Sequence, residues 1–168
     1  RAELVTRARD TANLVKQEGY FLHKYHPDRS LASSWHPWVD SRGNKVLPIQ
    51  EDETALVLWA LWRHFERNRA VEDVQPLYRP FVVRAAEFMD GYRDPETGLP
   101  LPSWDLWEER RGVISFTCAA VWAGLDAAAR FADAFGDEEL AHRFARAAAE
   151  VRAGTRSGAA LDGRARTV

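Results

Sequence analysis

The sequence predicts an all-α domain with its long loops gathered at one end. Apolar residues recur at helical spacing in five stretches, and no strand of convincing length appears. The connections between these stretches alternate between long and short, which is typical of stacked helical hairpins. Hydrophobic residues make up 46% of the 168 residues and charged residues 29%, as expected of a globular protein.

The first two helices are expected on either side of a long connection. The first runs from about residue 2 to about residue 17, with Leu4 and Val15 on one stripe and Gly19 as its stop. The second runs from about residue 52 to about residue 67 and is apolar almost all round. We therefore expect the second helix to be buried on most sides.

Three further helices are expected at about residues 73–92, 115–135 and 137–152. Asp73 would cap the first of these, and Pro80 within it predicts a kink or a delayed start. The last two helices are joined by a short link at a glycine.

The two long connections span residues 19–50 and 93–112. Loops of this length in a compact domain are usually functional, so we expect the site there. After residue 154 the helical period is lost. The domain is therefore predicted to span residues 1–154, with 155–168 as a frayed tail or an artificial end.

Composition excludes several classes of partner. Lys and Arg number 23 against 25 Asp and Glu, so the net charge of −2 indicates neither a nucleic acid nor an anionic membrane. No apolar run of about 18 residues is present, so no segment is expected to span a bilayer. Cys118 is the only cysteine, so it can form no internal disulfide and offers no metal cluster. We expect no metal site and no cofactor. No signal peptide is recognised, which slightly favours a cytoplasmic location, although the chain looks as if it starts inside a helix.

Six of the seven tryptophans occur as pairs spaced by three residues. The pairs are Trp35 with Trp38, Trp59 with Trp62, and Trp104 with Trp107. The pair on the second predicted helix is expected in the core. The two loop pairs could stack on the apolar face of a sugar ring or pin the loops onto the helices, and the residues alone leave both open.

Two acidic segments are candidates for chemistry. In the second long loop, Asp105, Glu108 and Glu109 flank Trp107. A carboxyl beside an indole would lose water, which favours its protonated form and suits a general acid. Alternatively, Glu108 and Glu109 would only complement the positive N-terminus of the following helix.

The other acidic segment, "QEDET", introduces the second predicted helix. Its amide and carboxylates, Gln50 and Asp52 among them, suit a ligand rich in hydroxyl groups. In the alternative interpretation, Asp52 or Glu53 caps the helix.

With these motifs in view, the chain resembles glycoside hydrolase family fifteen, the group of glucoamylases, glucodextranases and some trehalases, and its bacterial branch most of all. The resemblance rests on "GYFLHKYHPDRSLASSWHPW", "PIQEDETALVLWAL", "YRDPETGLPLPSWDLWEERRG" and "FTCAAVWAGL". It implies an (α/α)6 barrel, of which this chain would supply about helices two to six of twelve.

The same resemblance implies roles for individual residues. Glu108 matches the catalytic proton donor, Glu109 a residue that binds the sugar beyond the scissile bond, Trp107 a pocket wall and Asp105 a supporting aspartate. Gln50 and Asp52 align with a segment near the substrate, while Trp35 and Trp38 are candidates for a pocket tryptophan.

Two departures from the family pattern limit what the chain is expected to do. The Trp–Arg–Asp type motif that grips the non-reducing sugar has no match here, and the general base of the family lies downstream of this chain. The chain is therefore expected to be a fragment of an inverting hydrolase that releases glucose from α-glucans. By itself it is expected to be weakly active or inactive. The alternatives are a carbohydrate-binding remnant, a helical module that binds protein or itself through exposed inner-helix surface, and a parent enzyme with trehalase-type specificity.

Overall fold

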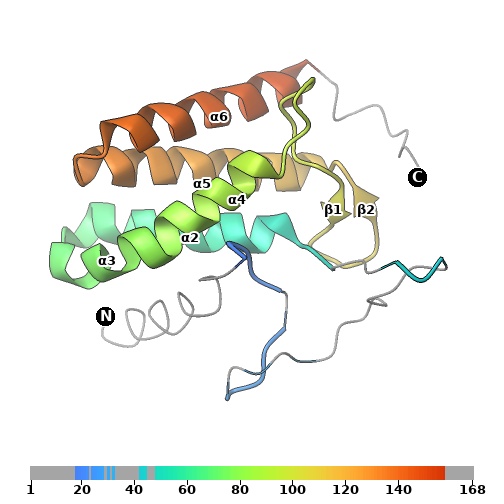
Figure 1. Ribbon diagram of the computed structural model, residues 1–168, viewed down its shortest axis with the longest axis horizontal. Coiled ribbons are helices and arrows are strands. Elements are labelled where there is room, and N and C mark those ends of the chain that lie inside the picture. Colours follow the sequence, from blue (N-terminus) through green and yellow to red (C-terminus); the bar gives the residue numbers. More distant parts are fainter. Residues whose placement is uncertain are drawn as a thin grey trace.

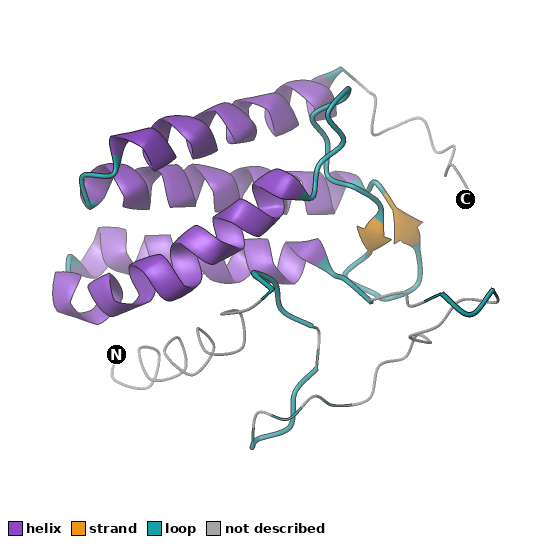
Figure 2. Ribbon diagram, in the orientation of Figure 1, coloured by secondary structure: helices purple, strands orange, loops and turns teal. Residues whose placement is uncertain are grey.

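A computed structural model describes residues 18–22, 24–28, 30, 32, 42–44 and 48–157. Its longer helices are α2 (Glu51–Asn68), α4 (Arg84–Gly91), α5 (Ser115–Ala134) and α6 (Glu138–Arg156). The remaining elements are α3 (Val71–Leu77), the π-helix η1 (Tyr78–Val83), and the strands β1 (Ser103–Trp104) and β2 (Arg111–Gly112). The described chain is therefore predominantly helical, which confirms the all-α class (Figure 2).

The helices lie in layers, with α5 between α6 and α2 (Figure 1). The short connections, between α2 and α3 and between α5 and α6, lie at one end of the bundle, while the strands lie at the other, beside the start of α2. The second long loop, in which we expect the site, therefore lies at the end of the bundle opposite the short connections.

Close packing of α2 on α5 depends on a glycine. A Cβ atom added at Gly124 would lie 3.0 Å from the Cα of Ala55, so a larger residue would push the helices apart. Around this contact the core includes the fully enclosed side chains Leu58, Val121 and Phe131. The expectation for the helical tryptophan pair is half met, because Trp62 is buried but Trp59 is 44% exposed.

The third predicted helix differs from expectation in two ways. It begins at Val71 with Ala70 as its N-cap, so the prediction that Asp73 caps it is wrong. Pro80 does not delay the start of the helix, and the local disturbance at this residue is the π-helical segment η1 between α3 and α4. A proline has no N–H to donate and its ring collides with the preceding turn, and the wider π-helical turn accommodates both effects.

The remaining helices agree closely with prediction. Helix α6 continues to Arg156, past residue 154 where we expected the domain to end. The expected first helix and most of the tail lie outside the described residues. Among the described helices, none has the combination of length and apolar character needed to cross a membrane.

Candidate active site

The loop that carries the DLWEE motif is a small, internally bonded hairpin. Strands β1 and β2 pair antiparallel, with Ser103 opposite Gly112 and Trp104 opposite Arg111. Between them, one oxygen of the Asp105 carboxylate accepts hydrogen bonds from the backbone N–H groups of Glu109 (2.8 Å) and Arg110 (3.1 Å). Asp105 therefore organises the turn, because it satisfies backbone donors that the short strands leave unpaired.

Glu108 adopts a backbone conformation that is unusual for its residue type. Its φ angle is +57°, in the left-handed region, and its N–H donates to the carbonyl of Asp105 at 2.9 Å. A residue with a Cβ atom is disfavoured in this region by about 1–2 kcal/mol. Its carboxylate is half-buried, with Oε2 shielded from solvent. The turn therefore holds this carboxyl against an intrinsic conformational cost, a feature that is often found at functional sites.

Trp107 does not cover the acids as the sequence predicts. Its side chain is 82% exposed, and its neighbour Leu106 is 45% exposed. Most of the indole faces solvent, so the expectation that this ring removes water from a neighbouring carboxyl is not supported by the geometry. The exposed ring is instead available to contact a ligand.

The two acidic segments meet. The N–H of Trp104 donates to the carbonyl of Ile49 at 2.9 Å, and the Gln50 amide Nε2 donates to the carbonyl of Asp105 at 2.7 Å. These bonds attach the DLWEE hairpin to the residues that start α2. The start of α2 and the hairpin therefore form one acidic site, although Gln50 and Asp105 lie far apart in the sequence.

Helix capping does not explain the acids at the start of α2. The N-cap is Gln50, which makes no capping hydrogen bond through its side chain. Asp52 is fully buried, and one of its oxygens accepts a hydrogen bond from the Thr117 hydroxyl at 3.2 Å. The alternative that Asp52 or Glu53 caps the helix is therefore wrong.

Burial changes the protonation of these carboxyls. It raises the pKa of Asp52, with a smaller contribution from the negative charge of Asp105. It raises the pKa of Glu53 to about 7, with further contributions from Asp52 and then Glu108. Removing water disfavours a charged carboxylate, and like charges add to that effect. Burial therefore shifts the protonation of Asp52 and Glu53 to higher pH than is ordinary for carboxyls.

Glu51 is the most isolated of the acids. Its side chain is fully buried, and neither carboxylate oxygen has a hydrogen-bond partner among the described residues. Burial raises its pKa well above the ordinary range, Asp52 raises it further and Arg93 lowers it. Glu51 was not among the residues predicted from the sequence. The available signal was that three acids open a helix that is apolar almost all round, so that some of them had to face inward.

The described residues bring together Gln50, Asp52, Asp105, Trp107, Glu108 and Glu109, the last of which donates its N–H to Asp105. Trp35 and Trp38 lie outside the described residues. In the described part of the chain, no group of three or more His, Cys, Asp and Glu side chains is arranged to hold a metal ion.

Comparison with known proteins decides the family. The family model for glycosyl hydrolases family 15 matches residues 40–162, most of the chain. The chain belongs to glycosyl hydrolase family 15. Searches of curated proteins and of solved structures returned no match.

Family 15 membership gives the helices their architectural context. The family fold is an (α/α)6 barrel, and the layered helices α2 to α6, with the long loop at one end, fit part of such a barrel. The match includes both acidic segments of the site, since Gln50–Asp52 and Asp105–Glu109 lie within residues 40–162. The matched region therefore contains both segments that the hydrogen bonds of Gln50 and Trp104 bring together.

Proposed function

We propose that this chain supplies the acid side of an inverting α-glucoside hydrolase that releases glucose from the non-reducing ends of α-glucans. Glu108 is the general acid. Its carboxyl protonates the glycosidic oxygen as the bond between that oxygen and the anomeric carbon breaks. The single observation that carries the proposal is the left-handed, half-buried Glu108 inside the family 15 motif, whose charge acts on Glu53 at the start of α2.

In this proposal, the other residues of the site bind the sugar or hold the catalytic loop in place. Glu109 and the exposed Trp107 contact the sugar, while Asp105 holds the turn through the N–H groups of Glu109 and Arg110. Gln50 and Asp52 support the same site from α2.

We assign the general base to no residue of this chain. Inversion requires a second carboxylate on the opposite face of the sugar, roughly 6.5–9.5 Å from the acid, with room for a water molecule. Losing one partner of an acid–base pair costs about 10²–10⁴-fold in rate, so this chain alone would be weakly active or inactive.

The decisive experiment is Glu108→Gln in the full-length protein, with maltose and maltooligosaccharides as substrates. We expect turnover to be abolished while calorimetry shows nearly unchanged binding, because the amide keeps the shape but cannot donate the proton. Glu139→Gln, at an exposed position at the start of α6, is the matched control and should keep full activity. Hydrolysis retained by Glu108→Gln would rule out the assignment.

The same assay resolves the sugar linkage. Maltose, isomaltose and trehalose report α-1,4, α-1,6 and trehalase-type specificity, and we propose an α-glucan as the preferred substrate. A carbohydrate-binding role without cleavage is the second candidate, favoured by the 82% exposure of Trp107. It predicts heat of binding with maltooligosaccharides and no hydrolysis in the full-length protein.

We also propose that this chain in isolation self-associates or binds protein through apolar helix surface. The exposed apolar side chains of the described helices include Trp59 at 44%, Phe116 at 47% and Trp122 at 36%. Apolar surface that gathers into large patches promotes association. If light scattering at high concentration shows only a monomer, self-association is ruled out.

A further inference from the structure

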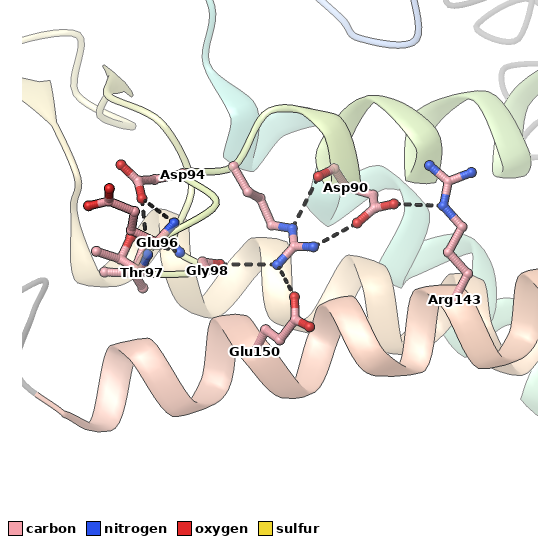
Figure 3. Close-up of polar contacts among 9 residues, drawn as sticks. Asp90, Asp94, Glu96, Thr97, Gly98, Arg143 and Glu150 are labelled. Atoms are coloured by element: carbon pink, nitrogen blue, oxygen red, sulfur yellow. Dashed lines mark hydrogen bonds and ion pairs between the residues drawn. The ribbon is translucent and has the colours of Figure 1, made fainter.

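A single arginine joins three elements next to the acidic hairpin. Arg93 lies two residues after the end of α4, and its side chain is only 12% exposed. Its guanidinium donates to the Asp90 carboxylate at 2.7 Å, the Glu150 carboxylate at 2.8 Å and the Gly98 carbonyl at 3.3 Å, the contacts that end on these residues in Figure 3. The end of α4, the turn that follows it and α6 are therefore held by one rigid, forked group.

The turn itself lies tightly against α6. A Cβ atom added at Gly154 would lie only 2.7 Å from the carbonyl oxygen of Thr97 and 2.9 Å from the side chain of Leu99. Gly98 adopts a positive φ of +70°, and a Cβ atom there would lie 3.2 Å from that of Glu150. The turn at residues 94–98 is further closed by Asp94, whose carboxylate accepts hydrogen bonds from the N–H groups of Glu96 and Thr97 (Figure 3). Even a small shift of this turn toward α6 would therefore produce a steric clash.

From this turn, the chain is bonded at successive points until it reaches Glu108. Arg93 pairs with Pro100 in an antiparallel bridge, and the N–H of Leu101 donates to the carbonyl of Tyr92 at 3.0 Å. Strand β1 begins two residues later, and its Trp104 is bonded to Ile49 before α2. These bonds follow one another at short intervals between the arginine and the hairpin, so the position of the hairpin is tied to that of the turn.

The positive charge of the same arginine also acts on the buried Glu51. Among the charges that act on Glu51, Asp52 raises its pKa and Arg93 lowers it. The arginine thus compensates part of the negative charge at the start of α2 while its donors hold the loop.

We propose that Arg93 is a positioning residue of the active site, which sets the place of Glu108 by fixing the loop between α4 and β1 against α6. This inference rests on the proposed function for its effect on catalysis. Arg93 touches neither substrate nor Glu108 in this proposal and acts only through the loop.

The kinetic test compares Arg93 with Arg143 in the full-length protein. Arg143 is the matched control because its Nε donates to the other oxygen of Asp90 at 2.7 Å but makes no contact with the loop (Figure 3). For Arg93→Met we expect kcat to fall roughly 10–100-fold, with KM changed by less than about threefold, because misplacement of a catalytic group affects the transition state most. Arg143→Met should change kcat by less than about threefold. Equal effects of the two substitutions would overturn the proposal.

Arg93→Lys keeps the test decisive if Arg93→Met does not fold. The ammonium retains the charge opposite Glu51 but cannot reach three acceptors in the planar fork that a guanidinium offers. We expect kcat of Arg93→Lys to be below that of Arg143→Lys at an unchanged circular dichroism spectrum. An Arg93→Lys protein with normal kcat would overturn the proposal.

Hydrogen exchange separates this inference from the proposed function. The N–H groups of Glu109 and Arg110, which are bonded to Asp105, report the order of the turn without any turnover. We expect them to exchange faster in Arg93→Lys than in Arg143→Lys. If the unsubstituted protein hydrolyses no α-glucoside, the proposed function fails, yet this comparison still decides the role of Arg93. Equal exchange in the two variants would count against the arginine alone.

Discussion

In the hairpin of α5 and α6, the fully enclosed side chains include the apolar Phe131, Phe144 and Val151, whereas at the start of α2 they include the acids Glu51 and Asp52. The hairpin also places its charges at the surface, as in the ion pair of Arg130 with Asp126. The start of α2 instead buries carboxyl groups, one of which has no hydrogen-bond partner among the described residues.

The two regions therefore differ in what they contribute to stability. Burial of a large apolar side chain stabilises the fold by about 1.5–3 kcal/mol, whereas an unpaired polar group that loses water costs about 1–3 kcal/mol. The left-handed Glu108 adds a conformational cost at the acidic end. We infer that apolar packing of the hairpin against α2 maintains an acidic site that is unfavourable by itself.

The largest effect is expected from a cavity in the stabilising region. Phe131 is fully buried, and its ring lies 4.9 Å from that of Trp62 and 5.6 Å from that of Phe65. Phe131→Ala should lower the free energy of unfolding by about 3–5 kcal/mol, as measured by urea denaturation. Phe116→Ala, at a 47% exposed position of the same helix, is the control and should cost less than about 1 kcal/mol. Similar losses in both variants would remove the distinction between the regions.

The next effect concerns the pH dependence that Glu51 causes. Its pKa is raised in the folded protein, so the folded state holds the proton more tightly than the unfolded state. Its contribution to stability is complete below the ordinary pKa of a glutamate and is lost as the pH rises toward the folded value. Glu51→Gln should remove this loss. The free energy of unfolding of the variant, compared with that of the original protein, should therefore be more favourable at pH 8 than at pH 4 by about 1–3 kcal/mol. Urea denaturation at both pH values measures it.

A control on the surface keeps this result interpretable. Glu139→Gln removes an exposed acid from α6 and should leave the pH dependence of stability unchanged. A Glu51→Gln protein with the same pH dependence as the original would mean that another group holds the proton.

A smaller effect is expected from the backbone of Glu108. Replacing it with glycine removes the left-handed penalty, so Glu108→Gly should raise the free energy of unfolding by about 0.5–1 kcal/mol while turnover is lost. Arg69, the C-cap of α2, has a φ of +53° and offers a matched control. Arg69→Gly should stabilise to a similar extent without loss of turnover. Stabilisation at Arg69 alone would show that the turn does not strain Glu108.

The stabilising region could largely be predicted from the sequence. The periods of α2, α5 and α6 are strong because one face of each helix must be apolar. At Pro80 the sequence predicts a local disturbance, but its form, a π-helical turn inside a continuous helical segment, depends on the packing of residues on both sides. The prediction that Asp73 caps the helix came from a local pattern alone, and the helix begins two residues earlier, at Val71.

The acidic site could be predicted only in pieces. Both acidic segments were recognised, but their junction through Gln50 and Asp105 depends on helix lengths and loop paths that no local pattern contains. Because Trp107 is next to acids in the sequence, its ring was predicted to shield a carboxyl from water, whereas the side chain is 82% exposed. Arg93 was missed because its three partners belong to separate elements.

The smallest effect on stability is expected at Trp107, although its effect on sugar binding should be clear. Since 82% of the side chain is exposed, Trp107→Ala should change the free energy of unfolding by less than about 0.5 kcal/mol. An exposed indole that stacks on a sugar contributes about 0.5–1.5 kcal/mol, so affinity for maltotriose in the full-length protein should fall about two- to tenfold by calorimetry. Trp62→Ala, at a buried position of α2, should show the opposite pattern, with a large loss of stability and little change in the affinity of the remaining folded protein. If Trp107→Ala instead destabilised the fold and left affinity unchanged, its ring would serve the loop, and the acidic end would owe part of its stability to its own aromatic residues.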